Sequence, residues 1–393
     1  MIRNFVMKLD PEVRMSVPEI IRHWGYPVET HEVTTSDGYM LEMHRIPRGK
    51  HEPAAGADGT QSIEATGPKP VVFLMHGLEG SSAAWMANMP WQSAGFMFAD
   101  AGCDVWMGNL RGNTYGKKHQ TLSTEDSEFW RFSYDEMAEF DLPSMVDYAL
   151  SQSGQSKLYY VGHSQGSMIM FAKASRDQEF AKKIDSFFAL APIAHVANIE
   201  GFLTKIAPYT DHIQLLWKLI GYNEFVPNND LSDKLAEMCR FWFANELCQN
   251  FIFALAGSDT KQMNQTRIPV YLAHTPAGTS SQNIVHFGQN VRNKKFQMFD
   301  WGTQKNVEKY GQSTPPLYDP STMIIPTYLY RGNHDILADP TDVDLLESEL
   351  PNVQSVIKLD NFNHLDFIWG LHAAPLVYQP IIEIIRDKEA KLF

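Results

Sequence analysis

Two kinds of hydrophobic pattern divide this chain. Predominantly apolar runs recur at 71–75, 102–107, 157–161, 184–190, 324–330 and 353–359. Runs of this kind are typical of strands that are buried on both faces of a sheet. Helix-length segments, for example 135–150, separate most of the runs. This alternation predicts an α/β fold, in which a mostly parallel central sheet is covered by helices on both faces.

A different pattern precedes the first apolar run. Residues 31–35 and 39–46 alternate in polarity around Ser36-Asp37-Gly38. Asp-Gly between alternating segments is a strong signal for an antiparallel hairpin. Residues 47–70 contain several Pro, Gly and Ala residues without periodicity, so we expect a surface loop there.

The alternation of strand and helix stops between residues 196 and 322. This stretch is rich in aromatic residues and methionine, and its apolar residues are not confined to one helical face. We interpret it as helices inserted over the edge of the sheet. The predicted organisation is therefore an N-terminal part of the core at 1–195, a helical cap and lid at 196–322, and a C-terminal part of the core at 323–393.

The central residue of one five-residue motif is a candidate nucleophile. The strand pattern at 157–161 leads directly into Gly162-His163-Ser164-Gln165-Gly166, and helix-compatible residues follow. A sharp turn from strand to helix holds a serine hydroxyl clear of the fold. The chain packs so closely there that only glycine fits at the positions two residues before and two residues after the serine. The pattern predicts Ser164 as the nucleophile of a hydrolase. The alternative is a Gly/Ser turn that matches the motif by chance.

A serine needs a base that takes its proton and an acid that orients the base. In α/β hydrolases these follow the nucleophile in the order acid, then histidine. Asp335 lies just beyond the strand pattern at 324–330, where the acid belongs, and Asp339 is the rival. Because Pro340 follows Asp339, that residue suits a helix N-cap better. His364 follows the last strand pattern and is the candidate base, although any of the 14 histidines could be structural.

Two backbone amides should stabilise the oxyanion that forms on the substrate. One is the N–H of the residue after the nucleophile, Gln165. The other should come from the loop after the first buried strand, and Leu78 is the candidate there. We interpret His76, in the same loop, as a residue that stabilises the loop through a hydrogen bond.

Composition narrows the class of protein. The chain has 393 residues and a formal net charge of −13, so it lacks the basic footprint of a nucleic-acid-binding protein. Protonation of all 14 histidines would raise the net charge to +1, which is compatible with an acidic compartment. The sequence has no apolar run long enough for a transmembrane helix. The apolar stretch among its first residues is too short for the core of a signal peptide. We therefore expect a cytosolic protein or a mature form whose signal has been removed.

The three cysteines leave alternatives open. Cys103 lies in a strand pattern and is expected in the core. Cys239 and Cys248 could form a short disulfide or be two unrelated thiols. Asn264-Gln265-Thr266 is an acceptor triplet for N-glycosylation. The sequence has no metal-ligand cluster and no nucleotide-binding glycine spacing, so we expect no metal and no cofactor.

Taken in order, these motifs give the chain a family resemblance over nearly its whole length. It resembles the acid lipases, which include gastric lipase and lysosomal acid lipase. The matching segments are Ile20-Ile21-Arg22-His23-Trp24-Gly25-Tyr26-Pro27, Ser36-Asp37-Gly38-Tyr39, His76-Gly77-Leu78, Arg111-Gly112-Asn113-Thr114-Tyr115, Phe132-Ser133-Tyr134-Asp135-Glu136-Met137, Gly162-His163-Ser164-Gln165-Gly166 and His274-Thr275-Pro276-Ala277-Gly278-Thr279-Ser280.

The resemblance implies an α/β-hydrolase fold with a Ser164, Asp335 and His364 triad, oxyanion amides from Leu78 and Gln165, and a mobile lid. It also implies a Cys239–Cys248 disulfide, glycosylation at Asn264, and a lysosomal or secreted protein. The implied reaction is acidic hydrolysis of triacylglycerols or cholesteryl esters at a lipid–water interface. The alternatives are an esterase for short soluble esters and a lipid carrier without turnover. The sequence does not indicate an oligomeric state. Gly116-Lys117-Lys118 departs from the family, which more usually has a serine-containing run there.

Overall fold

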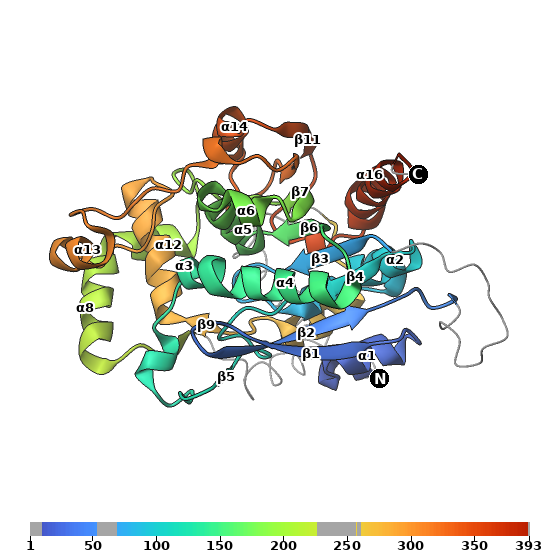
Figure 1. Cartoon of the computed structure of the whole chain (residues 1–393), viewed down its shortest axis with the longest axis horizontal. Coiled ribbons are helices and arrows are strands. Elements are labelled where there is room, and N and C mark those ends of the chain that lie inside the picture. The colour runs from blue at the N-terminus through green and yellow to red at the C-terminus, as the bar shows by residue number, and fades with distance from the viewer. Residues whose placement is uncertain (1–9, 53–68, 226–256, 258–260, 392–393) are drawn as a thin grey trace, which may run out of the picture.

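The computed structural model describes residues 10–52, 69–225, 257 and 261–391. Within these residues a sheet of nine strands runs in the order β1-β2-β4-β3-β6-β7-β10-β11, with β5 paired to β2 (Figure 1). All pairs from β4 to β11 are parallel, so the predicted mostly parallel sheet is confirmed. The strands are β1 (Glu29–Thr34), β2 (Tyr39–Ile46), β3 (Val71–Met75), β4 (Asp104–Met107), β5 (Lys118–His119), β6 (Leu158–His163), β7 (Ile184–Leu190), β10 (Thr327–Gly332) and β11 (Val353–Leu359).

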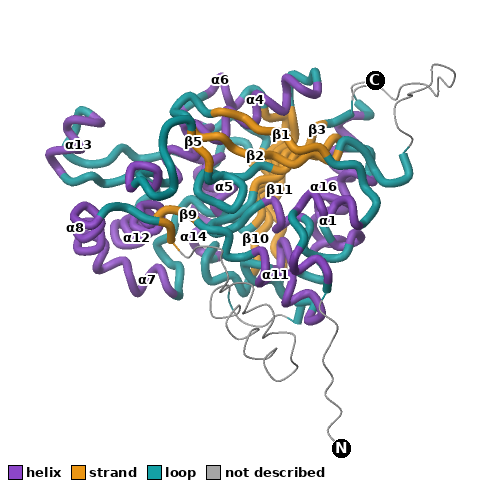
Figure 2. Tube along the Cα trace, turned by 90° about the horizontal axis from the view of Figure 1, so that it is seen from below, coloured by secondary structure: helices purple, strands orange, loops and turns teal. Residues whose placement is uncertain are grey.

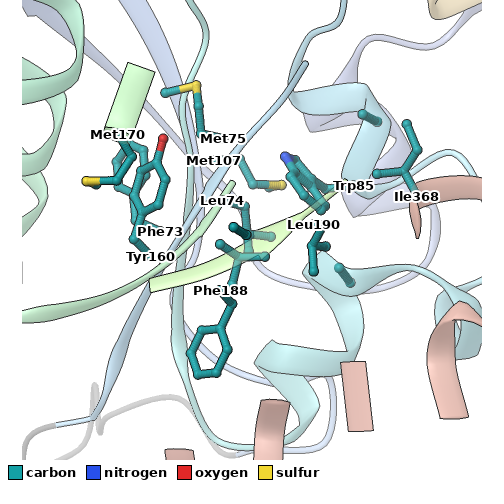
Figure 3. Close-up of a cluster of buried hydrophobic side chains, with 14 of the residues drawn as sticks. Phe73, Leu74, Met75, Trp85, Met107, Tyr160, Met170, Phe188, Leu190 and Ile368 are labelled. Carbon is teal, nitrogen blue, oxygen red and sulfur yellow. The ribbon is translucent and has the colours of Figure 1, made fainter. Parts of the chain in front are cut away.

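The strands from β4 to β10 in the sheet order are largely buried on both faces, which explains their continuous apolar runs. The prediction was wrong for residues 353–359, because β11 is an edge strand and most of its residues are partly or fully exposed. Phe73 and Tyr160 lie on the same side as Met170 of the following helix, whereas Leu74 and Trp85 lie on the opposite side (Figure 3). Successive side chains of a strand point to opposite faces, so both sets must be apolar. The α-helices are α1 (Val17–His23), α2 (Ala94–Asp100), α3 (Tyr134–Glu136), α4 (Leu142–Ser153), α5 (Gln165–Arg176), α6 (Gln178–Ala181), α7 (Phe202–Ile206), α8 (Thr210–Ile220), α11 (Ile268–His274), α12 (Ser281–Asn293), α13 (Thr303–Tyr310), α14 (Pro340–Glu349), α15 (Asp366–Trp369) and α16 (Gln379–Glu389).

The predicted N-terminal hairpin is confirmed. Strands β1 and β2 are antiparallel, and Thr34 pairs with Met40 across the turn. Gly38 has φ of 101°, a left-handed conformation that glycine adopts without steric cost. Most of the loop expected at 47–70 lies outside the described residues.

Two local predictions were wrong in detail. The helix expected at 135–150 is interrupted by a π-helical turn at Met137–Asp141, between α3 and α4. Pro143 has no N–H to bond the carbonyl four residues before it, and the wider turn lies just ahead of it. Strand β10 begins at Thr327, three residues later than expected, because Pro326 cannot donate to the sheet.

The segment 196–322, called the cap segment below, includes several of the described helices. Figures 1 and 2 both place α8, α12 and α13 together at one end of the molecule, beyond the sheet. Helix α11 instead packs into the core, where Tyr271 is fully buried and stacks on Trp369. A two-stranded sheet joins β8 (Glu224–Phe225) to β9 (Thr279–Ser280). The boundaries at 195 and 322 stay a prediction. Among the described helices, none has the length and apolarity that a membrane crossing requires.

Candidate active site

Ser164 lies on the sharp turn between β6 and α5. Its backbone angles are φ 53° and ψ −120°, which a residue with a side chain rarely adopts. A Cβ on Gly166 would lie 2.3 Å from the Met75 carbonyl oxygen, and one on Gly162 would lie 2.7 Å from the Gly166 carbonyl oxygen. These contacts are with backbone atoms that cannot swing aside. The two glycines of the motif are therefore required for the close approach of β3, β6 and α5.

The structure brings together the three side chains that the sequence singled out. His364 Nε2 is 2.7 Å from Ser164 Oγ, and His364 Nδ1 is 2.9 Å from Asp335 Oδ2. All three residues are buried, with exposed fractions of 7% or less. Because Nδ1–H donates to the carboxylate, Nε2 is left as the acceptor for the serine proton.

Asp335 and its rival Asp339 have different surroundings. Asp335 follows β10 directly, and its Oδ1 accepts hydrogen bonds from the backbone N–H groups of Leu337 and Ala338. These bonds fix the carboxylate toward His364. Asp339 caps helix α14, where its side chain accepts from the Thr341 N–H at 2.7 Å. The N-cap interpretation of Asp339 is thus confirmed.

Two histidines support this site without touching Ser164 Oγ. His163 Nε2 donates to the His364 carbonyl oxygen at 2.8 Å, which holds the loop that carries the candidate base. His76 Nδ1 donates to the Gly77 carbonyl at 2.8 Å, in agreement with its predicted role in the loop. Burial lowers the pKa of His163 to about 3 and that of His76 to about 4, so both stay neutral. The contribution of His163 was not predicted, although its position inside the motif was a signal.

The two candidate oxyanion donors flank Ser164. Within the described part of the chain, the backbone N–H groups of Leu78 and Gln165 donate to no protein acceptor. Gly77 lies so close to Ser164 that a Cβ on Gly77 would be 2.9 Å from the Cβ of Ser164. This loop and the first turn of α5 therefore offer two unpaired donors beside the serine, as an oxyanion requires.

The side chain of Gln165 makes a contact that sequence reasoning missed. Its Oε1 accepts a hydrogen bond from Asn283 Nδ2, on α12 of the cap segment, at 2.8 Å. Asn283 Oδ1 in turn accepts from the Tyr134 N–H at 2.9 Å. Both residues are buried, so these bonds are shielded from water. No local pattern in the sequence links positions 165 and 283.

The remaining candidate residues lie elsewhere. Asn264 is partly exposed, and its side-chain Oδ1 accepts from the Thr266 hydroxyl and N–H. Cys103 is 3% exposed, which confirms its predicted place in the core. Cys239 and Cys248 lie outside the described residues, so their pairing stays a prediction. Within the described ranges, no group of three or more His, Cys, Asp or Glu side chains could hold a metal ion.

Comparisons with known proteins agree with the fold described above. A family model described as the α/β hydrolase fold matches residues 70–371, and one described as a partial α/β-hydrolase lipase region matches residues 17–89. Lipase lipl-1 of Caenorhabditis elegans is 47% identical, over 96% of this chain and 93% of that protein.

Two mammalian relatives are similarly close. Gastric triacylglycerol lipase of Bos taurus is 45% identical, over 96% of this chain and 93% of its own. Lysosomal acid lipase/cholesteryl ester hydrolase of Homo sapiens is 45% identical, over 96% and 92%.

Solved structures share the fold at low identity. A chain from Sulfolobus solfataricus superposes with a TM-score of 0.60 at 13% identity, covering 92% of this chain and 99% of that one. A thermophilic esterase from Thermogutta terrifontis gives a TM-score of 0.51 at 14% identity, covering 91% and 98%.

Proposed function

This chain belongs to the acid-lipase family of the α/β-hydrolase fold, and from that premise we propose that Ser164, His364 and Asp335 are its catalytic triad. The observation that carries the proposal is the continuous chain of contacts from Asp335 through His364 to the Ser164 hydroxyl, at 2.9 and 2.7 Å. A triad of this kind acts in acyl transfer, where the serine oxygen attacks a carbonyl carbon.

The reaction proceeds in two halves. As Ser164 Oγ attacks the ester carbonyl, His364 Nε2 takes its proton, and the amides of Leu78 and Gln165 donate to the developing oxyanion. His364 then protonates the departing alcohol, which leaves the fatty acyl group on Ser164. A water molecule that gives its proton to His364 attacks the acyl-enzyme. As the fatty acid departs, His364 returns that proton to Ser164 Oγ, which restores the starting state. Asp335 stabilises the imidazolium in both halves.

The proposed substrate is a triacylglycerol or a cholesteryl ester presented at a lipid–water interface. Two of the relatives described above are named for these substrates, which supports the proposal. So does helix α8 of the cap segment, which exposes large apolar side chains to solvent: Leu215 58%, Leu216 51%, Leu219 76% and Ile220 60%. An exposed apolar surface of this kind is costly in water and favourable against lipid.

We also propose a lysosomal or secreted location and glycosylation at Asn264. The names of the relatives and the partial exposure of Asn264 support this. The balance of charges adds to it, because protonation of the histidines near pH ~5 removes most of the net negative charge that would repel anionic lipid.

The test is a substrate panel at pH ~5, below the ordinary histidine pKa. Rates are measured on emulsified triolein, cholesteryl oleate and soluble p-nitrophenyl butyrate, with Ser164→Ala as the blank. We expect turnover of the emulsions that falls by about 10⁴-fold or more in the variant, with an unchanged melting curve. Retained turnover in Ser164→Ala would refute the triad. Turnover of the soluble ester alone would indicate an esterase, and no turnover of any ester would indicate a carrier.

A further inference from the structure

The residue after the candidate oxyanion donor Leu78 has an unusual conformation and an unusual environment. Glu79 has φ of 56°, in the left-handed region, which costs a residue with a side chain about 1–2 kcal/mol. Two hydrogen bonds accompany this conformation. The Glu79 carbonyl accepts from the Ala277 N–H at 2.7 Å, and its carboxyl Oε2 accepts from the Gly278 N–H at 3.1 Å. Glu79 thus ties the loop that presents Leu78 to residues 277–278 of the cap segment.

The carboxyl of Glu79 has little to compensate a negative charge. Part of the side chain reaches solvent, but its Oε1 is buried and has no hydrogen-bond partner in the described residues. A second carboxyl, from Glu224 of β8, lies against the same glycine, since a Cβ on Gly278 would be 2.6 Å from Glu224 Oε1. Lys117, a nearby cation, forms an ion pair with that second carboxyl, with Nζ 2.5 Å from Glu224 Oε1.

These surroundings favour the neutral form of Glu79. Burial raises the pKa of its carboxyl well above the ordinary value, and the charge of Glu224 raises it further. The Gly278 N–H and the charge of Lys117 oppose the shift without cancelling it. The remaining titratable group of the loop, His76, is uncharged because burial lowers its pKa to about 4.

We propose that Glu79 is a positioning residue: as a neutral acid it holds the Leu78 amide in the oxyanion site, and its ionisation at higher pH withdraws that amide. The inference rests on the proposed role of Leu78. An ionised carboxyl with one N–H donor gains by turning toward water. That movement breaks the bond to Gly278 and lets the strained residue relax. The loop would then no longer aim the amide of Leu78 at the position of the oxyanion.

The consequence is a fall of kcat on the alkaline side of the pH profile. Stabilisation of an oxyanion acts on the transition state, so kcat should fall while KM changes little. Above the pKa of Glu79 the neutral fraction decreases about tenfold per pH unit, and kcat should follow it until only the other stabilising groups remain.

The first experiment measures kcat and KM for p-nitrophenyl butyrate between pH ~5 and ~9, a range that brackets a raised carboxyl pKa. The variant Glu79→Gln keeps an oxygen that can accept from Gly278 but cannot ionise. We expect its alkaline decline in kcat to be absent or displaced upward by at least about one pH unit relative to the unsubstituted protein. The matched control is Glu179→Gln, the same change at a glutamate that is 82% exposed on its side chain and pairs with Lys182. Its profile should follow that of the unsubstituted protein.

A second variant tests the same idea in the opposite direction. Glu224→Gln removes the like charge and releases Lys117, so the pKa of Glu79 should fall and the decline in kcat should begin at lower pH. The inference is overturned if the pH profiles of kcat for Glu79→Gln and Glu224→Gln both coincide with that of the unsubstituted protein. That result would leave the proposed triad intact. If Glu79→Gln does not fold, an alkaline decline that stays in place in Glu224→Gln overturns it alone. Hydrolysis that persists in Ser164→Ala would refute the proposed function, and this inference with it.

Discussion

The turn that carries Ser164 and the loop 76–80 lie against each other, yet they are held in different ways. The turn is fixed by its own backbone, because β3, β6 and α5 approach so closely that Gly162 and Gly166 cannot bear a side chain. The loop is held by hydrogen bonds that Glu79 accepts from the backbone N–H groups of Ala277 and Gly278, almost two hundred residues later in the chain. The proposed nucleophile is therefore fixed by the sheet itself, whereas the proposed oxyanion donors depend on how the cap segment packs.

This difference predicts two classes of mutational effect. Changes to the triad should abolish the chemistry and leave folding intact. Changes to the contacts with the cap segment should reduce kcat partially, with effects that depend on pH or on a partner residue. The predictions that follow run from the largest expected effect to the smallest.

The largest effect should come from the acid of the triad. Asp335→Asn keeps an oxygen for the Leu337 and Ala338 N–H groups but allows the wrong histidine tautomer, so kcat should fall by about 10⁴-fold. The matched control is Asp339→Asn, since asparagine caps a helix as well as aspartate does. We expect that control to retain activity within about twofold. Equal losses in the two variants, measured on p-nitrophenyl butyrate, would contradict the assignment of Asp335.

An intermediate effect should come from the bond between Gln165 and Asn283. Gln165→Ala keeps the backbone donor but loses the anchor to α12, and we expect kcat to fall about tenfold, equivalent to about 1.4 kcal/mol. Asn283→Ala should cause a comparable fall, since it removes the other partner of the same bond.

A double-mutant cycle distinguishes the loss of the hydrogen bond between Gln165 and Asn283 from an unspecific disturbance of the structure. If the two side chains act through their mutual bond, the double variant should lose little more than the more affected single variant. Strictly additive losses in kcat would show that Asn283 does not act through Gln165.

The smallest effect should be on stability rather than catalysis. Asp135 accepts from the Tyr318 hydroxyl and the Phe299 N–H, and burial raises the pKa of its carboxyl to about 6. A raised carboxyl pKa contributes stability that is fully present below the unfolded value and is lost as pH rises through the folded value. Asp135→Asn should therefore gain Tm relative to the unsubstituted protein between pH ~4.5 and ~7.5, by several degrees. A constant difference in Tm across that range would contradict the raised pKa.

The same contrast explains what could be predicted from the sequence. The ends of parallel strands meet at one edge of a sheet, so Ser164, Asp335 and His364 could each be placed from the strand that precedes it. The relevant signals were local: the glycines around Ser164, and a polar residue directly after an apolar run. The hairpin at Gly38 could be read in the same way.

The remaining features of the site could not be predicted from the sequence because they depend on tertiary contacts. Glu79 meets Gly278, and Gln165 meets Asn283, through pairs of residues without any shared periodicity. The π-helical turn before Pro143 was missed because the surrounding apolar pattern is that of an ordinary helix. The pairing of Cys239 with Cys248 and the limits of the cap segment came from resemblance and composition, and they stay predictions.

The central claim is that Ser164 is the nucleophile activated by His364. The most direct measurement is to label the folded protein with a fluorophosphonate and to identify the modified residue by mass spectrometry. The account predicts one adduct, on Ser164, which is lost in Ser164→Ala and greatly slowed in His364→Ala. Labelling of a different residue, or rapid labelling of Ser164 without His364, would contradict it.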